Sequence, residues 1–230
     1  MRLKAILQNE TAGWKPLEII WLCTACLAVT IPAIMLNDKI TGIIAAVCGV
    51  AAAVLTGKGK ISCYVIGGIK CILYSIIAYN SKYYGEVMLN LLYFFPMEFY
   101  GIYVWHKNMN TDTHEVNKRR MNAKLRIITA TVIAIATVVY GKILQLMGGN
   151  LPYVDAFTTV NSVVGMLVTI KMFAEQWVLW IIINIVSGYM WFVDIQQGNN
   201  NIAMLMMWTI YLINSVIMLI RWHRASKIAD

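Results

Sequence analysis

The feature that most constrains this chain is a series of eight long apolar stretches separated by short polar segments. Each stretch has 18 to 23 residues, close to the roughly 20 that an α-helix needs to cross the hydrocarbon core of a bilayer. Backbone polar groups in lipid must pair within their own segment, so each stretch is predicted to be a helix rather than a strand. The predicted spans are residues 19–36, 40–57, 61–80, 83–105, 125–147, 152–171, 177–195 and 201–221.

Composition supports the same fold class. The chain is 60% hydrophobic and 13% charged, whereas a soluble domain is about 45–50% apolar and about 25% charged. Lipid must therefore cover much of the surface, and we predict an all-α polytopic membrane protein. A net charge of +8 would also fit a nucleic-acid-binding protein, but the basic residues lie between the apolar stretches, which excludes nucleic acid as the expected partner. Residues 1–15 are polar and basic, so we expect no cleaved signal peptide.

The distribution of Lys and Arg predicts which side of the membrane each loop faces, because cytoplasmic loops are enriched in both. With a cytoplasmic N-terminus, fifteen of the 19 basic residues fall on the cytoplasmic side. Lys39, Lys82 and Lys142 fall on the outer side, and Lys70 falls inside a span. Eight spans place the C-terminus in the cytoplasm too, and residues 106–126 form a basic cytoplasmic loop near anionic headgroups. The expected location is a bacterial inner membrane.

Cysteine and histidine form no pattern for a metal, a cofactor or covalent catalysis. All five cysteines lie in apolar stretches, where we expect them to pack as small side chains. Cys23 and Cys26 have the spacing of a redox pair, but that chemistry needs an accessible thiolate. No histidine lies in a predicted span, and no acidic pair has a useful spacing, so an intramembrane enzyme is the weaker alternative. A carrier without cofactor, metal or catalytic residues is expected.

An internal repeat is predicted from a shift of 116 to 117 residues along the chain. Tyr64 then aligns with Trp180, and Trp105 aligns with Trp222. Each repeat has three helices, one further helix joins them, and parallel repeats of this kind occur in transporters. The predicted organisation is residues 1–38 for the N-terminal segment and an extra helix, 39–106 for the first repeat, 107–150 for a basic loop and linker helix, 151–224 for the second repeat, and 225–230 for a tail.

Polar side chains recur near the middle of several predicted spans, at depths estimated from the helical rise. An unpaired amide in hydrocarbon is costly, so these groups should face a shared polar cavity or bind one another between helices. The shared cavity is the hypothesis that we follow, and interhelical bonding is its alternative. The residues at this depth are Asn161, Asn184, Tyr211 and Asn214, and Asn90 lies somewhat nearer the outside.

The seventh predicted helix carries the most informative pattern. Trp177, Trp180 and Asn184 are spaced i, i+3 and i+7, which places them on one helical face. Trp177 alone would fit an interfacial belt, but Trp180 lies deeper. Two indoles beside a midplane amide suit an aromatic ligand with a polar appendage, and a cationic ring would gain a further attraction to the indoles. This geometry favours an occluded solute over an ion channel.

The W-x-x-W-x-x-x-N pattern of Trp177, Trp180 and Asn184 resembles the PnuC family of bacterial vitamin transporters. Residues 84–90 together with Tyr93 are similar to another aromatic and amide segment of that family. The resemblance implies a SWEET-like 3+1+3 fold with an added N-terminal helix, facilitated diffusion of nicotinamide riboside, and a homotrimer. Relatives that carry thiamine or riboflavin share the fold, so those vitamins are the alternative substrates.

Two charged residues leave a second alternative open. Glu98 and Lys70 both lie within predicted spans, where lone charges are expensive. We expect the two side chains to neutralise each other. If Glu98 instead titrates alone, the carrier would be proton-coupled.

Overall fold

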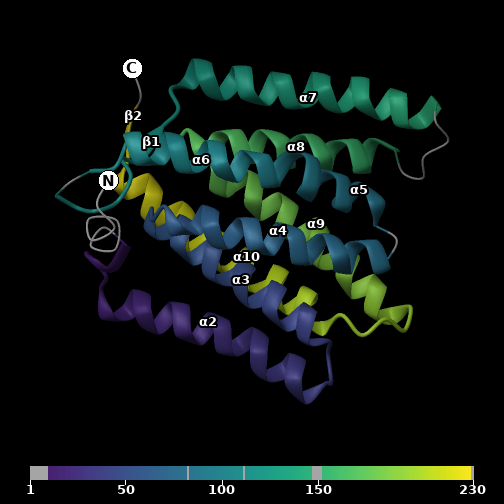
Figure 1. Ribbon diagram of the computed structural model, residues 1–230. Coiled ribbons are helices and arrows are strands. Elements are labelled where there is room, and N and C mark those ends of the chain that lie inside the picture. The colour runs from purple at the N-terminus through teal and green to yellow at the C-terminus, as the bar shows by residue number, and fades with distance from the viewer. Residues whose placement is uncertain (1–9, 82, 111, 147–151, 229–230) are drawn as a thin grey trace.

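The computed structural model describes residues 10–81, 83–110, 112–146 and 152–228. Most of these residues are helical, and the long helices lie side by side (Figure 1). The elements are α2 (Pro16–Met35), α3 (Ile40–Lys58), α4 (Ser62–Asn80), α5 (Tyr84–Met88), η1 (Leu89–Phe94), α6 (Phe95–Lys107), β1 (Arg119–Arg120), α7 (Ala123–Leu146), α8 (Pro152–Ile170), α9 (Gln176–Gln196), α10 (Ile202–Ala225) and β2 (Lys227–Ile228).

Within these residues, eight helical segments are long and apolar enough to cross a membrane. The fourth is continuous from α5 through η1 to α6 and covers Gly85–Lys107. The prediction of an all-α membrane protein with eight spans is confirmed, and the predicted bounds lie within a few residues of those observed. The two short strands pair in parallel outside the spans.

Six of the spans form a closed ring. Its order is α3, α4, the fourth span, α8, α9 and α10, and α10 packs against α3 to close it. We call α3, α4 and the fourth span the first half, and α8, α9 and α10 the second half. Neighbours follow the same order in each half, which is the arrangement that the predicted repeat requires. The repeat itself and its residue boundaries stay predictions.

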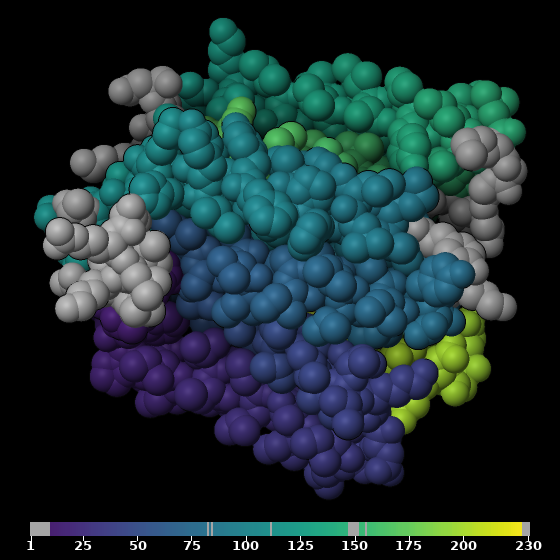
Figure 2. All heavy atoms as spheres, in the orientation of Figure 1, coloured from purple at the N-terminus to yellow at the C-terminus, as the bar shows by residue number. Residues whose placement is uncertain are grey.

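The other two spans lie outside the ring, at opposite edges of the molecule (Figures 1 and 2). Span α2 packs against α3 and α10 through a stripe of small side chains at Ala25, Val29 and Ala33, spaced four residues apart as one helical face requires. Span α7 packs on α8 and buries only Gly141 among the residues described in it. Most of its surface is therefore left for lipid.

The fourth span contains a π-helical turn, η1, directly before Pro96. A proline donates no backbone hydrogen bond to the preceding turn, so a regular α-helix is interrupted there. In a π-turn the residues advance around the axis by a smaller angle than in an α-helix. Side chains on this segment therefore face directions that α-helical spacing does not predict, and Asn90 and Tyr93 both lie on it.

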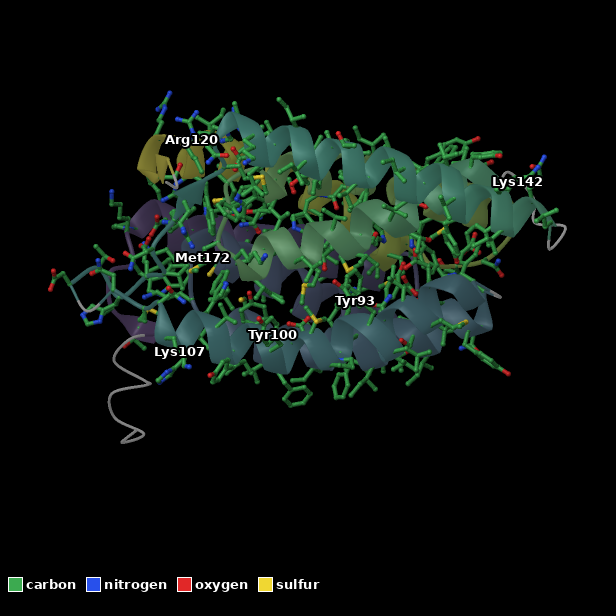
Figure 3. The ribbon with its side chains drawn as sticks, turned by 90° about the horizontal axis from the view of Figure 1, so that it is seen from above. Tyr93, Tyr100, Lys107, Arg120, Lys142 and Met172 are labelled. Atoms are coloured by element: carbon green, nitrogen blue, oxygen red, sulfur yellow. The ribbon has the colours of Figure 1, made fainter. Side chains whose placement is uncertain are left out.

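The positive charges gather at one end of the bundle, which we call the basic end. Lys107 and Arg120 lie there, whereas Lys142 lies at the opposite end (Figure 3). The start of α2 and strand β2 also lie at the basic end (Figure 1). Arg2, Lys4 and Lys82, which contribute to the predicted orientation, lie outside the described residues.

Candidate functional site

A cavity of about 150 Å³ lies inside the ring, and every helix of the ring contributes to its lining. Neither α2 nor α7 contributes, because both lie outside. The lining residues are Gly49, Ala52, Ala53, Thr56, Cys63, Tyr64, Gly67, Lys70, Cys71, Phe94, Glu98, Met166, Thr169, Trp177, Trp180, Asn184, Trp208, Tyr211 and Ser215. Six of them are aromatic, so the cavity can hold a flat ring between side-chain rings.

The tryptophan and asparagine face of α9 borders this cavity. The Trp180 indole donates a hydrogen bond to the Thr169 hydroxyl at 2.9 Å, which fixes the ring against α8. Asn184 is buried, and its amide donates to the Ser215 hydroxyl on α10 at 2.9 Å. Trp177 is also buried and packs edge-on against Trp222. The structure thus brings Trp177, Trp180 and Asn184 together as their spacing predicts.

Tyr211 is a fourth predicted residue that lines the cavity. Its ring lies edge-on to Trp208, with centroids 5.3 Å apart. Gly49 on α3 makes room for it, because a β-carbon at Gly49 would overlap the Tyr211 hydroxyl and lie 2.7 Å from the Met207 sulfur. The position of the Tyr211 side chain in the lining therefore requires glycine at position 49 of α3.

The other four predicted residues do not line the cavity. Asn214 accepts a hydrogen bond from the Trp21 indole at 3.1 Å and donates to a carbonyl of α3, so it joins α2, α3 and α10. The buried Asn161 amide donates to the Phe157 carbonyl within its own helix.

The remaining two lie on the π-turn. The Asn90 oxygen accepts a hydrogen bond from the Lys70 ammonium at 3.0 Å, and its amide donates to the Glu86 carbonyl. The Tyr93 hydroxyl donates to the Val163 carbonyl at 2.8 Å, which links the two halves. Both side chains bind other protein groups and do not line the cavity.

Three side chains of the lining carry a polar atom without a partner. The Tyr64 hydroxyl and the indole nitrogens of Trp177 and Trp208 are buried and make no hydrogen bond within the described part of the chain. A buried polar group left unpaired costs about 1–3 kcal/mol. A molecule with hydroxyl or amide groups has the chemistry to pair with these atoms.

Lys70 and Glu98 also border the cavity, but no ion pair joins them in the described structure. The two side chains therefore form no direct ion pair, and their mutual neutralisation at longer range stays a prediction. The Lys70 ammonium turns toward Asn90 and lies 4.5 Å from the centre of the Tyr74 ring. The carboxylate of Glu98 stays beside α4.

Several lining residues were absent from the predicted set, among them Tyr64, Phe94, Thr169 and Trp208. For Tyr64 the sequence held a signal, because the internal alignment pairs it with Trp180. Phe94 lies on the π-turn, where α-helical spacing gives no reliable face. Thr169 and Trp208 are recognised only once the ring order is known.

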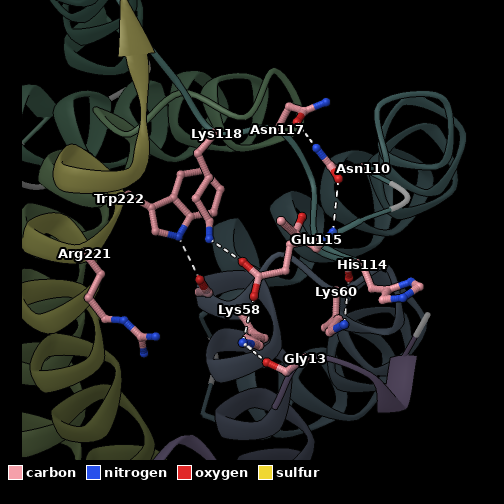
Figure 4. Close-up of polar contacts among 12 residues, drawn as sticks. Gly13, Lys58, Lys60, Asn110, His114, Glu115, Asn117, Lys118, Arg221 and Trp222 are labelled. Carbon is pink, nitrogen blue, oxygen red and sulfur yellow. Dashed lines mark hydrogen bonds and ion pairs between the residues drawn. The ribbon is translucent and has the colours of Figure 1, made fainter. Parts of the chain in front are cut away.

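A second polar region lies at the basic end, outside the cavity. We call Glu18, Lys58, Glu115, Lys118 and Arg221 the ion-pair cluster. Lys58 binds Glu18 at 2.6 Å and Glu115 at 2.7 Å, Lys118 binds Glu115 at 2.6 Å, and Arg221 pairs with Glu18. Figure 4 shows the Glu115 carboxylate between Lys58 and Lys118. The cluster connects α2, α3, α10 and the 108–122 segment.

The titration of groups near the cluster follows from their surroundings. Burial alone would raise the pKa of Glu115, but the ion pairs with Lys118 and Lys58 outweigh it and lower that pKa below its ordinary value. Lys60 lies beyond the end of α3, and burial lowers the pKa of its ammonium. The Lys60 ammonium donates to the carbonyls of Ala12 and His114.

Two tryptophans join the halves at the basic end. The Trp105 indole of the first half donates to the carbonyls of Thr169 and Ile170 at 3.3 and 3.2 Å. The Trp222 indole of the second half donates to the Gly57 carbonyl at 2.7 Å. Each tryptophan therefore binds the end of the first helix of the opposite half.

Comparison with known proteins adds to this geometry. Residues 39–224 match the model of the nicotinamide mononucleotide transporter family. The chain belongs to this family. The match covers the six helices of the ring together with α7, and it begins after the first span.

Two relatives and one solved structure support membership of the nicotinamide mononucleotide transporter family. The nicotinamide riboside transporter PnuC of Neisseria mucosa is 34% identical over 220 residues, which is 94% of this chain and 84% of the relative. That of Haemophilus influenzae is 31% identical over 230 residues, 99% of each chain. The crystal structure of the vitamin B3 transporter PnuC matches with a TM-score of 0.87 and 32% identity, over 98% of each chain.

Membership of this bacterial family of multi-pass membrane transporters confirms the predicted resemblance and the expectation of a transporter rather than an enzyme. Within the residues that the structure describes, no group of three or more His, Cys, Asp and Glu side chains is placed to hold a metal ion. The chemistry of the cavity is therefore that of its aromatic rings, hydroxyls, amide and charges.

Proposed function

We propose that this chain carries nicotinamide riboside across the bacterial inner membrane and binds it in the cavity inside the ring. The observation that carries the proposal is an aromatic cavity shared by both halves, in which the Tyr64 hydroxyl and the Trp177 indole nitrogen have no described partner. The relatives named as nicotinamide riboside transporters support the choice of substrate.

The proposed binding mode assigns each part of the ligand to one side of the cavity. The pyridinium ring stacks among Trp180 and the neighbouring rings, where a desolvated cation gains attraction from the π-faces. Asn184 offers a donor and an acceptor for ribose hydroxyls or the carboxamide. Trp177 and Tyr211 complete the lining, whereas Asn90, Tyr93, Asn161 and Asn214 support it through contacts between and within helices.

The proposed transport cycle is facilitated diffusion by alternating access, with the first and second halves moving against each other. This assignment rests on the predicted parallel repeat and on a cavity that both halves line. A homotrimer and cytoplasmic termini belong to the same proposal. A proton-coupled cycle is the alternative, and it would accumulate substrate when only a pH gradient is imposed on proteoliposomes.

Titration calorimetry on purified protein tests the substrate. Nicotinamide riboside should bind, whereas nicotinic acid, which lacks the ribose and carries a carboxylate, should not. Tight binding of thiamine or riboflavin without a response to nicotinamide riboside would reassign the chain to another vitamin. Saturable uptake of chemically unchanged nicotinamide riboside into proteoliposomes separates a carrier from an enzyme or a channel.

Labelling of a single cysteine tests the orientation. Asn117 is exposed in the basic segment, so Asn117→Cys presents a thiol at the basic end of the bundle. An impermeant maleimide should fail to label it in intact cells and should label it after the cells are opened. Efficient labelling in intact cells would invert the proposed orientation.

A further inference from the structure

The Glu98 carboxyl group borders the cavity. Among the residues that the structure describes, no basic side chain lies within ion-pair distance of it, although the charge of Lys70 acts on it from beyond that distance. Its described hydrogen-bonding contact is with the Cys71 sulfur, at 3.9 Å. Thiols are weak donors, so this contact compensates little of the cost of removing a carboxylate from water.

Gly67 explains how the carboxylate reaches this place. A β-carbon at Gly67 would lie 2.7 Å from one Glu98 oxygen and 3.1 Å from the other. The absent side chain on α4 therefore leaves the space that the carboxylate occupies. Both residues border the cavity, so the charge is presented to whatever the cavity holds.

Lys70 is the basic residue of the cavity lining, and its ammonium is engaged elsewhere. It donates to the Asn90 oxygen at 3.0 Å and lies 4.5 Å from the Tyr74 ring centre and 5.9 Å from the Phe94 ring centre. These contacts draw the positive charge toward the π-turn and away from ion-pair distance of Glu98. The cavity thus combines a carboxylate with six aromatic side chains.

A carboxylate and aromatic faces share one preference. Both attract a positive charge, the first through its own charge and the second through the ring quadrupole. A neutral ligand of the same shape would gain neither term. The lining is therefore suited to a flat ring that carries a fixed positive charge.

We propose that Glu98 is a specificity-determining residue that selects a cationic heteroaromatic ring over its neutral counterpart. This inference rests on the proposed function, because it assigns to Glu98 the pyridinium charge of nicotinamide riboside. It also separates the alternative vitamins, since thiamine carries a cationic ring and riboflavin does not.

The test compares nicotinamide riboside with its 1,4-dihydro form, which has nearly the same shape but no ring charge. Truncating one member of a desolvated charge pair costs about 2 kcal/mol or more, so wild-type protein should prefer the cation by at least roughly 30-fold. Glu98→Gln should remove that preference by weakening cation binding, while binding of the dihydro form stays near wild type. Glu98→Asp retains the charge and should retain a preference for the cation.

The outcomes separate this inference from the proposed function. If wild-type protein binds neither form, the proposed function fails. If it binds both equally, or if Glu98→Gln keeps the full preference for the cation, the role of Glu98 fails and the proposed function stands. Should Glu98→Gln not fold, the wild-type ratio and Glu98→Asp still decide the question.

Discussion

The cavity and the ion-pair cluster are both polar regions of an apolar protein, and they differ in how their polar groups are paired. In the cluster every charged side chain has a partner of opposite sign, and Lys58, Glu18 and Glu115 have two each. In the cavity the Tyr64 hydroxyl, the Trp177 indole nitrogen and the Glu98 carboxylate lack such partners among the described residues.

This difference separates two roles for buried polar groups. Paired charges stabilise the arrangement of α2, α3, α10 and the 108–122 segment, and removing one takes an ion-pair partner away from a buried charge. Unpaired buried groups lower the stability of the ligand-free protein, and in the proposed function a bound ligand would pair with them. Variants in the cluster should therefore change stability without changing affinity, and variants in the cavity should do the reverse.

The largest effect is expected for Lys58→Met. Lys58 is 6% exposed and binds both Glu18 and Glu115, so its loss removes one ion-pair partner from each of two carboxylates. Glu18 keeps Arg221 and Glu115 keeps Lys118, so the expected cost lies at the lower end of the range for breaking a buried pair, about 3 kcal/mol. The melting temperature in detergent should fall strongly, while the properly folded fraction keeps its affinity for nicotinamide riboside. Lys118→Met is the matched control with one partner, and it should have a smaller effect. An unchanged melting temperature for Lys58→Met would contradict a structural role for the cluster.

Trp180→Ala should have the next largest effect, on affinity. A tryptophan that packs on a bound ring is worth about 2 kcal/mol or more, which corresponds to a loss of about 30-fold. Trp21→Ala provides a control, because Trp21 binds Asn214 outside the cavity and should affect the melting temperature instead. Calorimetry on both variants measures the two affinities. Equal losses of affinity for Trp180→Ala and Trp21→Ala would contradict a separate binding role for the cavity.

Asn184→Leu sharpens the comparison at a single residue. The substitution should lower affinity for the riboside by about 5- to 150-fold, since a buried hydrogen-bond partner is worth about 1–3 kcal/mol. Ser215→Ala removes the described partner of the Asn184 amide but keeps the amide itself in the lining, so it should lower affinity less than Asn184→Leu does. A destabilised Asn184→Leu protein with unchanged affinity would make Asn184 an interhelical contact rather than a binding residue.

The smallest expected effect is the pH dependence of the cluster. Ion pairing lowers the pKa of Glu115 below its ordinary value of 4.5, so the folded state releases this proton more readily than the unfolded state. The stability from Glu115 is therefore complete above about pH 4.5 and is lost as the pH falls through the lowered pKa. The difference in melting temperature between wild type and Glu115→Gln should shrink on acidification. A difference that grows would reverse the assigned sign.

The fold followed closely from the sequence because lipid imposes a simple rule on helix length. The stretch 40–57, for example, corresponds to Ile40–Lys58, and 177–195 corresponds to Gln176–Gln196. The order of helices around the ring was not accessible in the same way. Neighbours in the ring such as α10 and α3 are far apart in the chain, and apolar composition carries no information about which pair meets.

The candidate site was predictable where helices are regular. Trp177, Trp180 and Asn184 lie on an unbroken α-helix, so their spacing gave their shared face. Asn90 and Tyr93 lie on a π-turn, which rotates side chains away from the α-helical expectation. Asn161 and Asn214 lie near the middle of their predicted spans, and both are buried as that position suggests. The position of a residue along a span does not give the direction in which its side chain points.

The crossed indole bonds of Trp105 and Trp222 have a consequence for the populations of open and closed states. Each bond joins one half to the other at the same end of the bundle, so a motion that separates the halves there breaks both together. Two such bonds are worth about 1–3 kcal/mol in total. They alone would bias the equilibrium toward the closed basic end by a factor of roughly 5 to 150.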